Sequence, residues 1–406
     1  MADERGRSRG FGRFWASNTL SAFGTTATAV ALPVLVVDGL GATAIQVGIV
    51  NAAQFVPYAV LGLIAGVFVD RWRRRPTLVV ASLGRALSLG AVPLVWALDA
   101  LSIWSLVALL VAFGSFSVFG FAASQSLLPR LVPGERLLRA NARIDQGEAT
   151  AQTVGPTLAG LLVRWVGAPV ALLIDAITYV VDAVLIASLA VDEAPVRTRG
   201  HVLRDMREGL AATYRHRVLL PLALSTHVWF IANAASLTVL SLFALRTLDL
   251  GPAVFGLLLS AIGAATLVGS SLAERLGVRL GEGATITLSR LLYPAAWIGV
   301  ALVPAVSGAG GIVLLFVALA VGGFAAGAEN ANEMSYRQRA VPDAVLGRVN
   351  ATSRSVNRTA GAVGAIAGGV LAAAVGIPAA LWIIAGVFAV AAAIAVFSPV
   401  RTERAR

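Results

Sequence analysis

Two aspartates interrupt an apolar stretch, LLIDAITYVVDA, near the end of the first half of the sequence. They are Asp175 and Asp182, and a spacing of seven residues places them on a similar face of a helix. A carboxyl group in low-dielectric surroundings can bind and release a proton, so either residue is a candidate proton carrier. A fixed hydrogen bond between helices is the alternative role for both.

Three more ionisable side chains, Asp145, Glu148 and His227, also fall in long apolar segments. A histidine titrates near physiological pH, so His227 is a further candidate for proton coupling, although a hydrogen bond between helices is the commoner role. Asp145 and Glu148, with Glu329 and Glu333 further along, are more typical of an ion-pair network between helix bundles. Such pairs can still be exchanged during a conformational change, so both acids remain coupling candidates.

The composition shows what surrounds these side chains. Of the 406 residues, 58% are hydrophobic and 13% charged, and the mean hydropathy is +0.82, which predicts a chain embedded in a lipid bilayer. A hydrocarbon core about 30 Å thick requires roughly 20 apolar residues per helix. The sequence offers twelve such segments: 14–37, 44–69, 77–98, 102–126, 139–163, 169–191, 218–245, 252–274, 284–303, 311–334, 348–374 and 379–399.

The polar breaks between these segments differ in charge. Every basic residue apart from the histidines is an arginine, and the arginines gather in alternate breaks. The rich breaks are Arg5 to Arg13, Arg71 to Arg75, Arg130 to Arg139, Arg197 to Arg217, Arg275 and Arg279, Arg337 to Arg348, and Arg401 to Arg406. The positive-inside rule therefore predicts that both termini lie in the cytoplasm, as in a multi-pass protein of the inner, or plasma, membrane.

Missing residue types exclude several classes of protein. Without lysine the chain has neither the phosphate-binding loop of a transport ATPase nor the Schiff base of a retinal protein. Without cysteine it has no disulfide and no thiol chemistry. No cluster of histidines or carboxylates has catalytic or metal-ligating spacing, so we expect no enzyme, metal or cofactor. The arginines do not gather with aromatics on a soluble face, so we expect no nucleic-acid partner.

The two halves of the sequence are related by a constant offset, so that adding 209 to a residue number gives the equivalent position in the second half. The offset superimposes Arg130, Pro133, Arg139, Asn141 and Ala142 on Arg339, Pro342, Arg348, Asn350 and Ala351. Without a gap it then superimposes Val154, Gly155, Gly160, Gly167 and Pro169 on Val363, Gly364, Gly369, Gly376 and Pro378. We therefore predict an all-α membrane protein of twelve transmembrane helices in two bundles, 1–191 and 218–406, joined by a cytoplasmic linker, 192–217.

The break between the second and third segments, GVFVDRWRRRP, contains one aspartate among four arginines. A glycine, then Asp-Arg four residues on, then a basic cluster resembles the loop motif of the major facilitator superfamily. In that family the motif implies a cytoplasmic latch, here Gly66, Asp70 and Arg71 against Arg348 and Arg354 of the other half. Asp70 ends a helix whose dipole disfavours an anion, so it requires such a partner. A basic loop that only binds anionic headgroups is the alternative.

A second motif, AQTVGPTLAG, lies in the segment 139–163. It resembles the antiporter motif of the same superfamily, with alanine at two of its glycine positions. Pro156 bends the helix, while Gly155 and Gly160 permit close packing against another helix. Together with SLLPRLVPGERLLRANAR and LLIDAITYVVDA, the motif looks like the branch that contains enterobactin exporters and drug-efflux proteins.

This resemblance implies a monomeric secondary transporter that works by alternating access in the lipid bilayer. We expect proton-coupled efflux of small amphipathic molecules, such as drugs or siderophore-like metabolites. An importer of the same fold is the alternative, and a channel or a membrane sensor is more distant. The residues expected to line a substrate cavity are polar or aromatic: Asn18, Thr25, Asn51, Gln54, Gln125, Trp229, Asn233 and Asn357. Hydrogen bonding between helices is the alternative role for the polar ones.

The latch leads to a prediction for Asp70→Asn. Removal of the negative charge should slow transport without affecting membrane insertion, because only the contact with Arg348 and Arg354 is lost. The measurement is the transport rate divided by the amount of inserted protein. A wild-type rate in this variant would reduce the motif to a determinant of topology.

Overall fold

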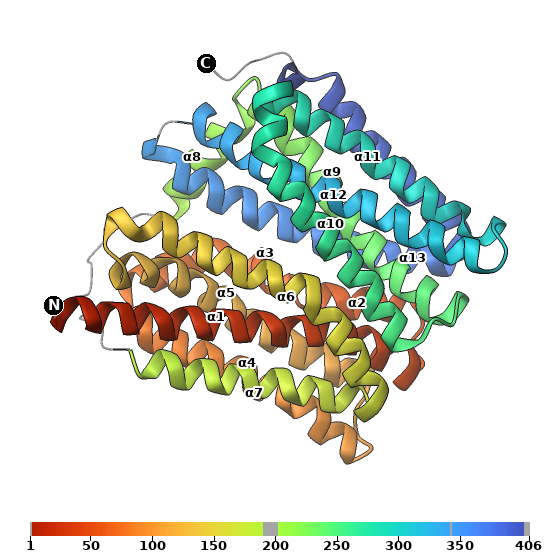
Figure 1. The fold of residues 1–406 in the computed structure, drawn as a ribbon, viewed down its shortest axis with the longest axis horizontal. Helices are drawn as coiled ribbons and strands as arrows, with labels where there is room; N and C mark the ends of the chain where they lie inside the picture. Colours follow the sequence, from red (N-terminus) through yellow and green to blue (C-terminus); the bar gives the residue numbers. More distant parts are fainter. Residues whose placement is uncertain (1, 190–201, 342, 402–406) are drawn as a thin grey trace. The chain divides into compact units, whose positions relative to one another are not determined.

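The computed structural model describes residues 2–189, 202–341 and 343–401, and every regular element in these ranges is a helix (Figure 1). The helices of the first half are α1 (Ala2–Val34) with the π-helical turn η1 (Leu35–Gly39), α2 (Ala44–Ala53), α3 (Val56–Arg71), α4 (Arg74–Ala97), α5 (Ile103–Leu131), η2 (Gly134–Arg136), α6 (Leu137–Val166) and α7 (Ala168–Ala187). Those of the second half are α8 (Val202–Tyr214), α9 (Leu219–Leu242) with the π-helical turn η3 (Phe243–Thr247), α10 (Gly251–Leu280), α11 (Glu282–Leu302), η4 (Val303–Ala305), α12 (Ala309–Ala340), α13 (Asp343–Val396) and η5 (Pro399–Arg401).

Each of the twelve predicted segments falls on described helices. By length and hydropathy, ten stretches of the described residues are long and apolar enough to cross a membrane. The number is lower than twelve for two reasons. The helix α6 is less apolar than the others and is not among the ten, and α13 counts once although Gly376 breaks its helical backbone between the predicted segments 348–374 and 379–399.

The repeat in the sequence is also a repeat in the backbone. Gly167, between α6 and α7, has φ 85° and ψ 159°, and Gly376, the equivalent position in the second half, has φ 80° and ψ 160°. Such angles favour glycine because it has no Cβ. Asp99 and Gly308, a second pair of equivalent positions, share a positive φ as well, 52° and 64°. The last apolar segment of each half therefore begins from the same backbone conformation.

The chain forms two compact units, each of which includes a short segment from the other half of the sequence. Unit 1 comprises Met1–Ala42, Ala53–Val202 and Leu250–Leu257, and unit 2 comprises Thr43–Ala52, Leu203–Asp249 and Leu258–Arg406. Most of α2 thus belongs to unit 2, and the first turns of α10 belong to unit 1. This exchange was not anticipated, and the predicted domain boundaries at 191 and 218 remain a prediction, because residues 190–201 lie outside the described residues.

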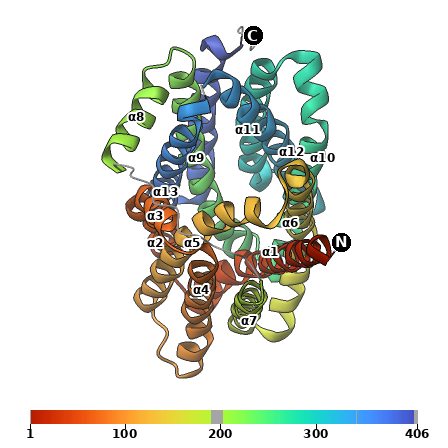
Figure 2. The same ribbon diagram turned by 90° about the vertical axis from the view of Figure 1, so that its left-hand side faces the viewer.

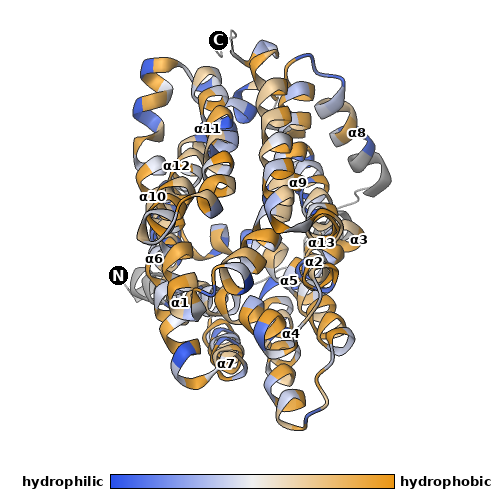
Figure 3. Ribbon diagram, turned by 90° about the vertical axis from the view of Figure 1, so that its right-hand side faces the viewer, coloured by the Kyte–Doolittle hydropathy of each residue, from blue (hydrophilic) through white to orange (hydrophobic). Residues whose placement is uncertain are grey.

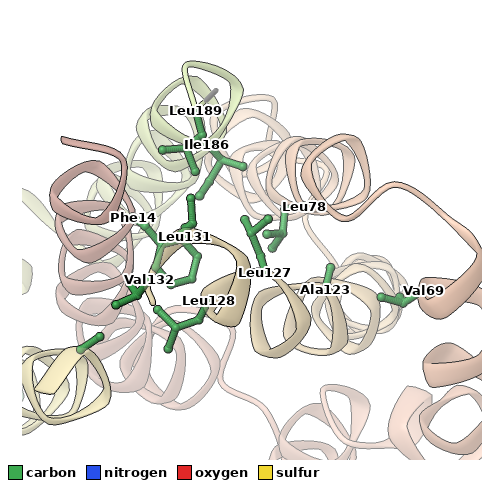
Figure 4. Packing of buried hydrophobic residues seen from close by; sticks show 11 residues of the cluster. Phe14, Val69, Leu78, Ala123, Leu127, Leu128, Leu131, Val132, Ile186 and Leu189 are labelled. Carbon is green, nitrogen blue, oxygen red and sulfur yellow. The ribbon is translucent and has the colours of Figure 1, made fainter. Parts of the chain in front are cut away.

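Within unit 1, α4 packs against α5 and α7, and α1 packs against α6 and α7 (Figures 1 and 2). A cluster of buried apolar side chains joins these helices near one end, with Phe14 of α1, Leu78 of α4, Leu127 of α5 and Ile186 of α7 among its members (Figure 4). Arg13 Nη1 donates a hydrogen bond to the Ser188 carbonyl oxygen at 2.9 Å beside this cluster. The packing holds α1 and α7 together, the two helices whose polar groups are described below.

Within unit 2, α13 packs along α9, and α11 packs against α12 and α13.

Across both units, apolar residues prevail along the helices (Figure 3), and many large ones are exposed, such as Leu87 (75%) and Trp165 (75%). Exposing these apolar side chains to water would cost free energy, but in a bilayer they face lipid. A helix also satisfies its own backbone hydrogen bonds, as a membrane-spanning segment requires. The exposed apolar surface therefore supports a membrane-embedded chain.

Glycines at the helix crossings lead to a prediction about stability. A Cβ on Gly364 of α13 would lie 2.7 Å from the Ile231 Cα of α9, whereas one on Gly386 would meet nothing within 4 Å. Gly364→Ala should therefore overpack the crossing and cost about 1 to 3 kcal/mol. Gly386→Ala, the matched control, should keep or raise stability, because alanine favours helix by about 1 kcal/mol. The unfolding temperatures of the purified variants in detergent measure both, and equal shifts would contradict the described packing.

Candidate functional site

Unit 1 contains a buried ion pair between α4 and α7. Arg85 Nη2 lies 3.4 Å from Asp182 Oδ2, and the hydroxyl groups of Ser17 and Ser82 donate hydrogen bonds to the two oxygens of that carboxylate. Arg85 Nη2 also donates to Ser82 Oγ at 2.9 Å. Ser82 and Arg85 are three residues apart on α4, so both reach Asp182 from one face of the helix. We call Ser17, Ser82, Arg85 and Asp182 the Asp182 cluster.

The second candidate acid of α7, Asp175, has different surroundings. Its side chain is 0% exposed, and its partners are the hydroxyl groups of Thr28 on α1 and Thr178 on α7. No described cation forms an ion pair with it. Tyr179 lies one turn along α7, and the Arg85 guanidinium stands over its ring, 4.4 Å from the centroid. Sequence reasoning named both acids as candidate proton carriers and favoured Asp182, and the structure shows an ion pair with the guanidinium for Asp182 alone.

Unit 2 contains a larger buried charge cluster between α11 and α12. Arg290, only 1% exposed, places Nη2 2.5 Å from Glu329 Oε1 and 3.2 Å from Glu333 Oε2. The same nitrogen donates to Thr226 Oγ1 of α9 at 3.0 Å, and Glu333 also pairs with Arg337 one turn further along α12. We call these five residues the Arg290 cluster. Its two arginines and two glutamates balance one another in charge.

The two clusters occupy related places in the repeat. Thr226 is the equivalent of Ser17, and Arg290 is the equivalent of position 81, one helical turn before Arg85. Sequence reasoning missed Arg85 and Arg290 because it counted the arginines of the polar breaks. The signal was present, since an arginine within an apolar run is costly and marks a functional or structural contact by default.

The predicted network between bundles stays a prediction, and the described contacts of two of its acids lie within one unit. Glu329 and Glu333 pair with Arg290 and Arg337, all within unit 2. Asp145 and Glu148 are exposed on α6, and we find no ion pair for either among the described side chains. Between them in the sequence, Gly147 is buried against Thr19 of α1.

His227 links three helices. Its Nδ1 lies 2.7 Å from Asn357 Oδ1 on α13, and its Nε2 lies 2.7 Å from the Tyr214 hydroxyl on α8. An amide oxygen can only accept, so Nδ1 carries the hydrogen and Nε2 accepts the hydroxyl hydrogen of Tyr214. Desolvation by burial raises the pKa of Tyr214, which keeps this hydroxyl protonated as a donor. The geometry thus agrees with the interhelical role of His227.

A small, partly open pocket lies in unit 2 beside this histidine, between α8, α9, α12 and α13. His227, Asn357, Glu333 and Arg337 are among its lining residues. Of the predicted cavity residues only Asn357 belongs to its lining.

The other predicted cavity residues have various surroundings. Asn18 donates to the Phe14 carbonyl of its own helix, Thr25 contacts the Tyr179 hydroxyl at 3.1 Å, and Asn51 donates to Thr238 Oγ1 at 3.1 Å. These three fit the alternative of bonding within and between helices. Trp229 packs edge-on against Tyr293, Gln125 is exposed, and Gln54 and Asn233 are half-buried.

The predicted latch is only partly described. Gly66, Asp70 and Arg71 lie in the last turns of α3, and their side chains are outside the described part of the chain. Arg348 forms an ion pair with Glu208 of the linker helix α8, and Arg354 is exposed on α13. The pairing of Arg348 with α8 was not anticipated, because the linker was not predicted to be helical, and the latch itself stays a prediction.

The antiporter-type motif lies at two close crossings of α6. Gly155 faces Thr26 of α1, and a Cβ on Gly160 would lie 2.5 Å from the Pro252 carbonyl oxygen of α10. A matching crossing occurs in unit 2, where a Cβ on Gly48 of α2 would lie 2.6 Å from the Ala365 carbonyl oxygen of α13. Pro156 and Ala365 stand at equivalent positions of the two halves, so the two crossings are repeats of one another.

Known proteins resemble the chain over nearly all of its length. Residues 7–406 match the family profile described as a transmembrane secretion effector. The uncharacterized MFS-type transporter y4rN of Sinorhizobium fredii is 28% identical over 293 residues, 71% of this chain and 70% of that protein. The multidrug efflux pump Tap of Mycobacterium tuberculosis is 30% identical over 210 residues, which cover 49% of this chain and 50% of the pump.

Solved structures add a likeness in fold. A crystal structure of the nucleoside transporter NupG matches with a TM-score of 0.79, covering 95% of this chain and 99% of that one at 12% identity. At such low identity the match establishes a shared fold and nothing about substrate.

The Asp182 cluster leads to a prediction about stability. Arg85→Met should strongly destabilise the protein, because it leaves a buried carboxylate without its cation, at a cost of about 3 to 5 kcal/mol. The double variant Arg85→Met/Asp182→Leu removes both charges and should regain most of that loss. Thermal unfolding in detergent compares the two, and a double variant no more stable than the single one would contradict the ion pair.

Proposed function

Because the chain belongs to the transmembrane secretion effector family of the major facilitator superfamily, we propose that it exports small amphipathic molecules in exchange for protons. The molecules are drugs or siderophore-like metabolites of the kind that enterobactin-exporter-like proteins handle. The protein works as a monomer in the inner membrane, with both termini in the cytoplasm, and it requires a proton gradient and no cofactor.

The crossing of α6 with α10 carries the proposal for export. Gly160 lies six residues before the end of α6, which the distribution of arginines assigns to the outer side of the membrane. Here the two backbones touch without intervening side chains, and Pro156 removes one backbone donor nearby. Such a contact can keep an exported molecule from returning. The similarity to a multidrug efflux pump over half of the chain supports the same direction.

The buried carboxyl groups support coupling to protons. Asp175, Asp182, Glu329 and Glu333 are all buried, and each lies on a helix that spans the apolar region. Acids at such positions are costly unless they are paired or protonated, so a change in protonation there changes the preferred arrangement of the helices. This link between proton and conformation is what an antiporter requires.

Import of a small solute is the second candidate function. The match to NupG, a nucleoside transporter, concerns the fold alone, and a fold does not fix the direction of transport. A channel or a membrane sensor is the more distant candidate, since the paired α6–α10 and α2–α13 crossings suit alternating access better than a permanent pore.

Everted membrane vesicles test the direction and the coupling. When an acid-inside pH gradient is imposed, vesicles with the wild-type chain should accumulate ethidium or a labelled macrolide, and nigericin, which collapses the gradient, should abolish the accumulation. Gly160→Val should lose it, because the added side chain would collide with the Pro252 carbonyl at the crossing. Gly386→Val, whose position meets nothing within 4 Å, is the matched control.

Two outcomes would contradict the proposal. Accumulation that depends on ATP and persists with an uncoupler would exclude proton antiport. Expulsion of the probes from everted vesicles under the same gradient would indicate import instead of export.

A further inference from the structure

The number of available hydrogens differs between the two carboxyl groups of α7. Asp182 receives one hydrogen from Ser17 on Oδ1, and one from Ser82 and one from Arg85 on Oδ2. Each of these groups has a hydrogen to give, and one of them is a permanent cation. Three donors around one carboxyl group suit an ionised Asp182, and no further proton is required there.

Around Asp175 one hydrogen is missing. Thr28 Oγ1 donates to Asp175 Oδ2, but Thr178 has to serve two acceptors with its single hydrogen. The shorter contact, 2.8 Å, joins Thr178 Oγ1 to the backbone carbonyl oxygen of Asp175, and the longer one, 3.2 Å, joins it to Asp175 Oδ1. If the hydrogen follows the shorter contact, two oxygens with lone pairs face each other at 3.2 Å.

A proton on Asp175 Oδ1 resolves this contact. The carboxyl group then donates to Thr178 Oγ1, and the Thr178 hydroxyl donates onward to the backbone carbonyl. The fit is tight, because a Cβ on Gly24 of α1 would collide with both Asp175 Oδ1 and Thr178 Oγ1. A neutral carboxyl group also avoids the cost of a buried charge without a counterion.

The charges around Asp175 also favour a protonated carboxyl group. The charged or titratable side chains near Asp175 are Arg85 from α4 and Tyr179 and Asp182 from α7, and α1 contributes the hydroxyl group of Thr28. One guanidinium therefore serves two carboxyl groups. With both acids ionised the site would carry one uncompensated negative charge, whereas with Asp175 protonated it is neutral.

From this geometry we infer that Asp175 holds a proton on Oδ1 and that this is the proton exchanged during transport. Asp182 and Arg85 act as positioning residues. The inference rests on the proposed function, because it names the group that performs the proposed coupling. On release, the Asp175 O–H bond breaks, the proton passes to water, and the electron pair stays on Oδ1. The Arg85 guanidinium, which stands over the ring of Tyr179 one turn along α7, can attract the new charge.

Infrared spectroscopy of the purified full chain tests the proton without any transport. The wild type at neutral pH should show the carbonyl band of a protonated carboxyl group, and Asp175→Asn should lose a distinct part of it. Asp182→Asn is the matched control on the same helix and should keep that part. Thr178→Ala, which leaves the carboxyl group in place, should shift its frequency through loss of the hydrogen bond. An unchanged band in Asp175→Asn would overturn the assignment.

Transport in everted vesicles tests whether the proton is used. Because asparagine mimics the protonated acid, Asp175→Asn should lose gradient-driven accumulation of ethidium but retain the exchange of labelled for unlabelled ethidium. Gradient-driven accumulation at the wild-type level in this variant would overturn the carrier role while proton-coupled export stands. No gradient dependence in the wild type would instead overturn the proposed coupling, and the infrared result would still decide where the proton lies.

Discussion

A guanidinium group cannot give up its charge within a protein, so an arginine inside a bilayer requires a carboxylate beside it. Arg85 and Arg290 meet this requirement in the two units. The Arg85 pair joins α4 to α7, and the Arg290 pair joins the successive helices α11 and α12. In both clusters a hydroxyl group of a further helix adds a hydrogen bond. The positions of α1, α4 and α7 in unit 1 therefore depend on one buried charge, and those of α9, α11 and α12 in unit 2 on another.

Glycines allow the helices to pack closely against one another. Bilayers provide no hydrophobic drive between helices, so close contact of backbones has to supply the attraction instead. The crossings of α6 with α10 and of α2 with α13 are of this kind, and each places a glycine against a carbonyl oxygen of the neighbouring helix. Because the two crossings stand at equivalent positions, both halves have kept the close contact together with the backbone turns at Gly167 and Gly376.

The elements of the fold were largely predictable, because hydropathy and the positions of arginines are local properties of the sequence. The twelve apolar segments coincide with described helices, and the repeat reappears in the dihedral angles of Gly167 and Gly376. The helix α8 was missed because it is too polar for a search based on hydropathy. The candidate site was less predictable. The partners Ser17 and Asp182 are far apart in the sequence, and only the packing of α1 against α7 brings them together.

The two halves differ in the positions of their buried acids. The positions that correspond to Asp175 and Asp182 in the second half are Ile384 and Ala391, and those that correspond to Glu329 and Glu333 in the first half are Gly120 and Ser124. Both halves thus place an arginine on the third apolar segment of the half, in α4 or α11, but unit 1 supplies the acids from α7 and unit 2 from α12.

Since a buried cation requires a partner but not a particular helix, the two halves could meet the same requirement differently. The two solutions differ in their balance of charge. The charges of the Arg290 cluster balance, whereas Asp175 and the Asp182 cluster together have one carboxyl group more than the Arg85 guanidinium can compensate. A proton is the simplest counterion for that surplus, so the asymmetry between the halves supplies a physical reason for the proposed exchangeable site.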